Sequence, residues 1–358
     1  MGGKGLSVSV WTSDQAFSWY NEQGWLVGCN FLPSSCINQI EMFQEDTFNI
    51  EDITKEISWA KGIGFNTLRV YLHDLLWEEK DQFLIRFNDF LDCCKRFEIK
   101  PIIVLFDDCH YPFPELGPQP LPVRGIHNSG WKQSPGHQIV TQIFELNAEQ
   151  QLKRLQRYTQ ELLELYQEDE RILMWDLYNE PGQFGIGEKS YTFLKNVWDW
   201  AHEIRPSQPL TSCLDGAIGD SIISLNQSKS DIITFHTYES EKLEPTISKL
   251  KKIGRPLMCT EYMAREYGTT FEFCLPIFKK YNIACYNWGL VAGRSQTNFN
   301  WETILYLNEQ RDKGNLIRDN DSLTEPNEWF HDIFRQDGSP YSKEEITFIK
   351  KILLNKEE

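Results

Sequence analysis

The sequence lacks the long apolar segments that carry a protein into or across a membrane. Its first fifteen residues, MGGKGLSVSVWTSDQ, hold no apolar core of the kind that signal peptides contain. No run reaches the roughly 20 apolar residues that a membrane-spanning helix needs. We therefore expect a cytoplasmic protein that does not bind membranes, although its glycine-rich start is also compatible with a removed leader.

Positive charge is scarce as well. The chain has 36 Lys and Arg against 52 Asp and Glu, which gives a formal net charge of −16 and a pI near 5.0. Because such a surface repels phosphate groups, the composition excludes nucleic acid as an expected partner. Neutral and cationic small molecules remain possible substrates. The sequence does not determine the oligomeric state.

The cysteines show no disulfide or metal-binding pattern. There are nine of them, an odd number, and none forms a C-x-x-C pair. Several lie inside apolar segments, as is typical of small buried hydrophobic residues; these are Cys94, Cys109, Cys213, Cys259 and Cys285. The pattern favours a reducing cytoplasm.

Several catalytic and cofactor signatures are also missing. The chain contains no G-x-S-x-G and no H-E-x-x-H, and its seven histidines do not follow metal-ligand spacing. The nearest approach to a phosphate-binding loop, residues 185–190, lacks the Gly-Lys-Ser/Thr ending and the third glycine of a dinucleotide fingerprint. We therefore expect neither a metal nor a cofactor.

What the sequence does contain is a regular alternation of short apolar runs and helical patterns. The apolar runs predict eight strands, at residues 25–30, 67–72, 101–107, 172–179, 209–214, 231–238, 256–262 and 284–290. Among the helices between them, one is expected to start at Asn49 and a longer one at Asn147; others are expected at 83–94, 191–204, 246–253, 270–281 and 344–354.

This order predicts an α/β fold, a single (β/α)8 barrel over residues 1–358. A doubly wound open sheet is the alternative, but it usually carries a glycine-rich phosphate turn after an early strand. Long loops are expected at about 108–146 and 291–340, after the third and eighth strands. In a barrel, both would leave the end at which active sites are built.

Polar side chains stand where several of the predicted strands end. Glu180 follows the fourth strand and Glu261 lies near the end of the seventh. Other strand ends supply Arg69, His110, Asn179, His236, Tyr238 and Trp288. Taken singly, each of these residues is also typical of a buried ion pair, a satisfied core histidine or simple packing. Together they predict an active site at one mouth of the barrel.

Two glutamates facing one cavity suit the cleavage of a glycosidic bond. One carboxyl protonates the leaving oxygen while the other stabilises the cationic anomeric carbon. A separation of about 5 Å favours direct attack and retained configuration, whereas about 6.5–9.5 Å admits a water and inverts it. The sequence alone does not determine this separation, so both the retaining and the inverting mechanism remain possible.

The segments WDLYNEP (175–181), FHTY (235–238), CTEY (259–262) and NWG (287–289) resemble the glycoside hydrolases of clan A, most closely family five. The resemblance covers roughly residues 20–350. It implies a (β/α)8 barrel with retaining chemistry, in which Glu180 is the general acid/base, Glu261 is the nucleophile and Asn179 binds the sugar 2-hydroxyl.

The same resemblance assigns supporting roles. Arg69 and Tyr238 would position Glu261 and keep it ionised, His236 would lie beside the acid/base, and Trp288 would form the sugar platform. The family often has a histidine after the third strand; His110 is the candidate, although DDCHYP (107–112) is not a close match. Two tryptophans in the long loops are also expected to contact substrate, namely Trp131 and Trp301.

A further resemblance, in residues 28–77, 127–136 and 289–297, points to exo-acting β-mannosidases that cleave short oligosaccharides. Two alternatives stay open. One is an endo-acting β-1,4-glucanase, mannanase or xylanase, which would release mixed oligomers rather than monosaccharide. The other is a catalytically inactive barrel that only binds sugars.

Overall fold

The computed structural model describes residues 10–214, 216–312 and 325–354. Eight parallel strands form one sheet in the order β5-β4-β3-β2-β1-β8-β7-β6. They are β1 (Val27–Asn30), β2 (Thr67–Tyr71), β3 (Lys100–Asp107), β4 (Met174–Asn179), β5 (Leu210–Thr211), β6 (Ile233–His236), β7 (Leu257–Tyr262) and β8 (Ala284–Trp288).

The sheet closes between its two outer strands. Asp231 donates its backbone N–H to the Leu210 carbonyl at 2.8 Å, and Leu214 donates to the Thr234 carbonyl at 2.9 Å. The predicted (β/α)8 barrel is therefore confirmed. The fifth strand is shorter than predicted, because only two of the residues in 209–214 keep a strand ladder.

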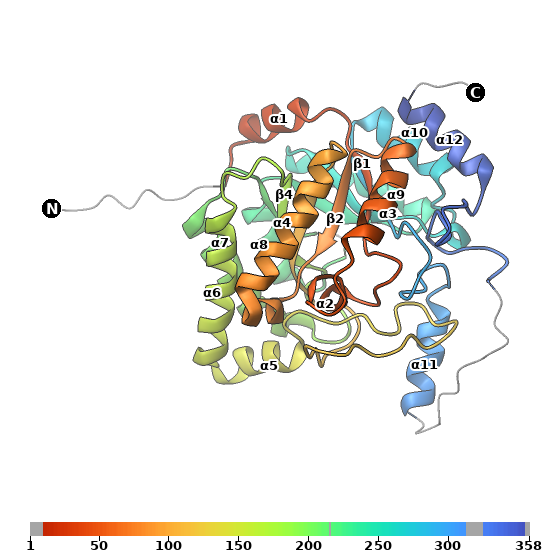
Figure 1. Ribbon diagram of the computed structural model, residues 1–358. Helices are drawn as coiled ribbons and strands as arrows, with labels where there is room; N and C mark the ends of the chain where they lie inside the picture. The colour runs from red at the N-terminus through yellow and green to blue at the C-terminus, as the bar shows by residue number, and fades with distance from the viewer. Residues whose placement is uncertain (1–9, 215, 313–324, 355–358) are drawn as a thin grey trace.

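Helices surround the strands (Figure 1). They are α1 (Ser13–Glu22), α2 (Gln39–Phe43), α3 (Ile50–Gly62), α4 (Lys80–Arg96), α5 (His137–Leu146), α6 (Glu149–Leu165), α7 (Ser190–Ile204), α8 (Asp220–Lys229), α9 (Ser240–Leu250), α10 (Phe271–Tyr281), α11 (Glu302–Asp312) and α12 (Lys343–Leu354). None of the helices in the described ranges combines the length and hydropathy needed to span a bilayer.

Two asparagines illustrate how local chemistry sets helix ends. Asn49 caps α3 as predicted, since its side chain accepts from the backbone N–H groups of Glu51 and Asp52. The predicted helix start at Asn147 is wrong. Asn147 has φ +48° and ends α5, which fills part of the expected loop at 108–146, and Ala148 precedes α6. Asparagine suits the first place because its side-chain oxygen accepts hydrogen bonds, and the second because it tolerates the left-handed conformation.

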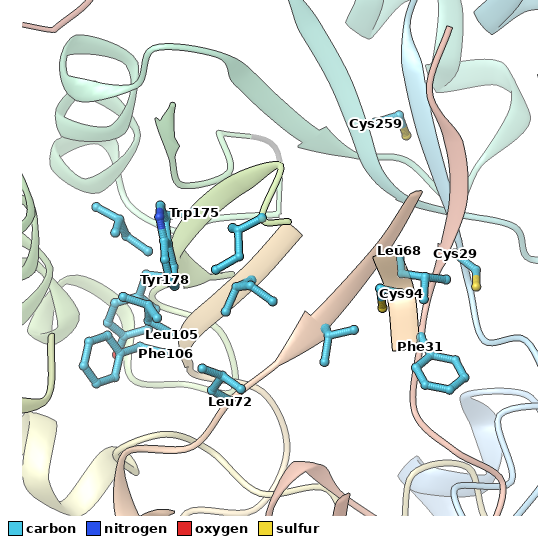
Figure 2. Packing of buried hydrophobic residues seen from close by; sticks show 14 of the residues in the cluster. Cys29, Phe31, Leu68, Leu72, Cys94, Leu105, Phe106, Trp175, Tyr178 and Cys259 are labelled. Atoms are coloured by element: carbon cyan, nitrogen blue, oxygen red, sulfur yellow. The ribbon is translucent and has the colours of Figure 1, made fainter. Parts of the chain in front are cut away.

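The main core lies between the strands and the helices. Phe106 of β3 packs edge-on against Tyr158 of α6 and Phe193 of α7, with ring centroids 5.5 and 4.9 Å apart. Figure 2 shows Phe106 beside Tyr178 of β4, whose ring centroid lies 5.9 Å away. Burial of each such ring contributes roughly 1.5–3 kcal/mol, so the strands are held as a rigid frame.

One end of the barrel is plugged. Tyr20 of α1 is buried against strand residues, and its hydroxyl accepts from the Ala284 N–H at 2.6 Å. Figure 1 shows α1 at the opposite end of the molecule from α2 and α11, and the arrow of β2 points toward α2. The polar side chains at the strand ends therefore face the end away from α1.

At that end, the two long segments are tied together in what we call the loop wall, residues 123–131 and 295–303. Asn128 donates its backbone N–H to the Ser295 carbonyl at 2.8 Å, and the Gly125 N–H reaches Gln296 Oε1 at 2.7 Å. In Figure 1 the segment between β3 and α5 crosses this end toward α11. The second expected loop, 291–340, contains α11, and its residues 313–324 lie outside the described ranges.

Candidate active site

Glu261, in β7, is surrounded by hydrogen-bond donors. Its Oε1 lies 2.9 Å from Arg69 Nη1 and 2.9 Å from the Tyr71 hydroxyl, and its Oε2 lies 2.7 Å from the Tyr238 hydroxyl. Burial by itself raises the pKa of Glu261. The charges of His236 and Arg69 and the two tyrosine hydroxyls outweigh burial, so the pKa lies below its ordinary value. This carboxylate is held ionised.

Arg69, in β2, is a fully buried charge with a complete set of partners. Its Nε and Nη2 contact Asp176 Oδ2 at 3.0 and 2.8 Å, and Nη2 also reaches Asn179 Oδ1 at 2.7 Å. Nη1 donates to Asn30 Oδ1 at 2.9 Å besides Glu261. Because a buried guanidinium is tolerated only when paired and hydrogen-bonded, Asp176 supplies the charge that keeps Arg69 in place.

Glu180, at the end of β4, has a different environment. Its backbone has φ +44°, a left-handed conformation that costs energy in a non-glycine residue and is common at functional sites. Its Oε1 lies 2.6 Å from His236 Nδ1, and its Oε2 lies 3.1 Å from Cys109 Sγ. No arginine or lysine ion pair reaches this carboxyl among the described residues, in contrast to Glu261.

The two glutamates are close together. One oxygen of each carboxyl and one nitrogen of His236 all lie within 4.8 Å of one another. His236 Nδ1 is 3.5 Å from Glu261 Oε2, so the imidazole bridges the pair. Burial lowers the pKa of His236, but the negative charges of Glu261 and Glu180 outweigh burial and raise it.

These three side chains are also the one group in the described ranges that has the spacing of a metal site. The donors around it do not suit a cation. Arg69 and Tyr71 already occupy Glu261 Oε1, and Tyr238 occupies Oε2. A divalent ion at this place would lie beside the guanidinium of Arg69. The donor set therefore fits an uncharged polar ligand better than a metal.

Asn179 and Trp131 are connected through a buried carboxyl. Asp107, at the end of β3, accepts from Asn179 Nδ2 at 2.9 Å and from Trp131 Nε1 at 2.6 Å. Burial raises the pKa of Asp107 to about 7, against the opposing effect of these hydrogen bonds. The Asn179 side chain therefore accepts a hydrogen bond from Arg69 through its oxygen and donates one to Asp107 through its nitrogen, and these two bonds fix its orientation in the site.

A cleft of about 700 Å³ opens above the two glutamates and is bounded by aromatic rings. Trp288 and Trp301 are both half-buried and line it. Trp131 also lines it but is only 3% exposed, with its ring edge-on to Tyr71 at 5.0 Å and 5.7 Å from Trp288. Trp288 and Trp301 thus offer ring surface to a ligand, whereas Trp131 mainly builds the wall behind it.

His110 lines the same cleft, but its neighbours are not the glutamates. Its ring lies 4.7 Å from the Phe184 ring, and its Nε2 lies 3.5 Å from Asn128 Nδ2. Burial and nearby His127 lower the pKa of His110 to about 3. From the segment after β3, it is Cys109 and not His110 that contacts Glu180.

The sequence prediction does not name several residues of this site, among them Asn30 and Asp107. Tyr71 shares the inward face of β2 with Arg69, two positions away, and this alternation is the signal for it. Asp176 is a charged residue inside an otherwise apolar strand, which is also a recognisable signal. Cys109 is interpreted from sequence as a buried hydrophobic residue, and nothing in the sequence shows its polar contact.

No protein-family model and no curated protein matches the sequence. Several solved structures match in three dimensions. One is the exo-β-1,4-mannosidase Op5Man5 from Opitutaceae bacterium strain TAV5, with a TM-score of 0.60 and 14% identity over 92% of this chain and 59% of that chain. This chain therefore spans less than two thirds of that protein.

Two others are similar over more of their own length. The endo-β-1,4-mannanase from Thermotoga petrophila has a TM-score of 0.57 and 14% identity over 95% of this chain and 79% of that chain. A glycoside hydrolase family 5 mannosidase from Rhizomucor miehei has a TM-score of 0.54 and 12% identity over 92% of both chains. This chain has the barrel fold of these enzymes.

Proposed function

We propose that this protein is a retaining β-glycoside hydrolase of the family-five type. The observation that carries the proposal is the pair Glu180 and Glu261, which have oxygens within 4.8 Å of each other in different environments. Glu261 is held ionised by Arg69 and two tyrosine hydroxyls, as a nucleophile must be. The short separation leaves no room for an attacking water between them and suits double displacement.

In the first step, Glu261 attacks the anomeric carbon and the bond from that carbon to the leaving oxygen breaks. Glu180 gives its proton to this oxygen, and the sugar becomes an ester of Glu261. In the second step, ionised Glu180 takes a proton from water, whose oxygen attacks the same carbon and releases Glu261. Two inversions give net retention.

We infer exo action from the loop wall. It is hydrogen-bonded from the β3 side to the β8 side, through Asn128 with Ser295 and His127 with Thr303. Its residues Asn128 and Trp131 line the cleft, and Trp131 packs 5.7 Å from Trp288, the proposed platform for the cleaved sugar. Glu180, which would serve the leaving group, lines the same cleft together with Gln183. A chain could therefore extend toward the leaving group but not past the cleaved sugar.

We propose a β-mannoside on a short oligosaccharide as the substrate. Support comes from the fold comparison, in which matched structures carry the names of mannosidases and mannanases. Because the cleft lining includes Trp288, Trp301 and several uncharged polar side chains, it suits an uncharged sugar. The nine cysteines are all described, unpaired and buried, which supports action in a reducing cytoplasm; detection of the protein only in an extracellular fraction would contradict this location.

The test is hydrolysis of nitrophenyl β-mannoside, β-glucoside and β-xyloside beside manno- and cello-oligosaccharides. We expect mannose as the product from the first minutes, released as the β-anomer by proton NMR. Mixed oligomers at early times would indicate an endo-acting enzyme, and a first-formed α-anomer would contradict the retaining mechanism. Binding without turnover of any substrate would indicate a sugar-binding barrel.

A further inference from the structure

Cys109 touches both residues at the end of β4. Its Sγ lies 3.1 Å from Glu180 Oε2 and 3.5 Å from Asn179 Nδ2. Its backbone N–H donates to Asp107 Oδ1 at 2.9 Å, which fixes the turn that carries the thiol. Cys109 also lines the cleft, and no other cysteine does so among the described residues.

The thiol is a neutral group at this place. Burial and the carboxylates of Asp107, Glu180 and Glu261 raise the pKa of Cys109 well above its ordinary value. A neutral thiol has one S–H donor that rotates and a sulfur that accepts. Asn179 Nδ2 approaches the sulfur as a donor at 3.5 Å, and the S–H has Glu180 Oε2 as an acceptor at 3.1 Å.

The two partners of Glu180 therefore differ in what they can do. His236 Nδ1, at Oε1, also lies within 3.5 Å of Glu261, and its proton is attracted to both carboxylates. An imidazole in this setting acts as a donor. Cys109, at Oε2, can donate its S–H to an ionised carboxylate and, after rotation, accept the O–H of a protonated carboxyl. A general acid/base must alternate between these two states during each turnover.

We propose that Cys109 is a positioning residue for Glu180, whose thiol holds the acid/base in one orientation in both its protonated and its ionised state. The inference rests on the proposed function, because it gives Glu180 the acid/base role. The thiol is the side chain from the segment after β3 that contacts Glu180, while the next residue, His110, packs against Phe184.

The first test compares Cys109→Ala with Cys109→Ser, using two β-mannosides that differ in the leaving group. A nitrophenyl mannoside needs protonation more than a dinitrophenyl mannoside, which departs unaided. We expect Cys109→Ala to lower kcat/KM, which reports the first step, about tenfold on the poorer leaving group, the effect of one lost hydrogen bond to a charged group, and to change kcat/KM on the better one little. Cys109→Ser, which keeps a rotating donor and acceptor, should restore most of the loss.

The matched control is Cys94→Ala, which removes a fully buried thiol in α4 that does not line the cleft. It should lower the melting temperature without changing the ratio of the two rates. Equal losses on both leaving groups in Cys109→Ala, or no recovery in a folded Cys109→Ser, would show that Cys109 only packs and would overturn the proposal.

A second measurement does not depend on activity. The Raman S–H stretching band of Cys109 is assigned by its disappearance in Cys109→Ser. We expect it at a lower frequency than the other thiol bands, and we expect it to move up in Glu180→Gln, because an amide oxygen is a weaker acceptor than a carboxylate. An unmoved band would refute the hydrogen bond. A wild type with the shifted band but no turnover of any glycoside would refute the proposed function and leave the contact standing.

Discussion

The environment of Glu261 leads to a quantitative prediction for Tyr238→Phe. The Tyr238 hydroxyl donates to Glu261 Oε2 at 2.7 Å, and this is the one hydroxyl on that oxygen among the described residues. Phenylalanine keeps the ring, which packs 4.8 Å from Trp301, and removes only the donor. The substitution therefore isolates one of the interactions that lower the pKa of Glu261.

The expected size follows from the strength of such a bond. A hydrogen bond to a charged group contributes about 1.5–3 kcal/mol. One pKa unit corresponds to about 1.4 kcal/mol, so loss of the hydroxyl should raise the pKa of Glu261 by roughly 1–2 units. In the proposed mechanism Glu261 must be ionised to attack, and its pKa sets the acid limb of the rate profile. Removal of the donor should thus move this limb to higher pH by the same amount.

The assay is the pH dependence of kcat/KM, which reports the free enzyme. A dinitrophenyl mannoside is the suitable substrate, because its departure does not depend on protonation by Glu180. The control is Tyr286→Phe, which removes a buried hydroxyl 3.0 Å from Thr67 Oγ1 inside the barrel. This variant should lose stability and keep the wild-type acid limb.

An acid limb that stays in place in Tyr238→Phe, with a lower kcat, would refute the reasoning. In that case the hydroxyl would serve the sugar rather than the charge on Glu261. A shift in Tyr286→Phe as large as that in Tyr238→Phe would also contradict it, since the cause would then be a general change in the barrel.

The remaining predictions concern roles, packing and one buried carboxyl. With azide, Glu180→Ala should give the β-glycosyl azide and Glu261→Ala the α-azide from an activated β-glycoside, and identical products would contradict the assigned roles. Trp288→Ala should lower kcat/KM with a small change in melting temperature. Trp131→Ala should instead lower the free energy of unfolding by roughly 3–5 kcal/mol, because its ring is buried. A larger loss of stability in Trp288→Ala than in Trp131→Ala, measured by calorimetry, would count against the role of Trp131 in the loop wall. Burial raises the pKa of Asp107 in the folded protein to about 7, so the folded state binds its proton more tightly than the unfolded state does. The free energy of unfolding of the wild type should therefore fall as the pH rises from about 4 to 7, by roughly 3–4 kcal/mol relative to Asp107→Asn. Urea unfolding at several pH values measures this difference. A difference that stays constant over this range would refute the raised pKa.

The sequence by itself determines the barrel and the pair of glutamates. Parallel strands covered by helices are apolar throughout, so runs such as 101–107 and 172–179 identify β3 and β4 with ends close to those observed. The carboxyl ends of parallel strands meet at one mouth. For this reason Glu180 and Glu261 could be placed together although they are 81 positions apart in the sequence.

The sequence also gives signals that become clear only beside the structure. Asp176 interrupts an apolar strand because Arg69, on another strand, needs a buried counter-charge. Tyr71 follows Arg69 on the same face. Helix α5 is hidden because the segment before it is rich in Pro and Gly, and because Asn147, which looks like a helix start, ends that helix in the left-handed conformation.

Only the tertiary structure decides what surrounds the two carboxyls. The loop wall depends on backbone hydrogen bonds such as that from Asn128 to Ser295, between irregular segments that have no periodicity to predict their pairing. The choice between Cys109 and His110 depends on one turn. His110 has φ +68°, so the chain reverses there and its imidazole faces Phe184, while the thiol before it faces Glu180. Adjacent residues in a loop point in directions that backbone torsions set, and those torsions follow from packing over the whole mouth of the barrel.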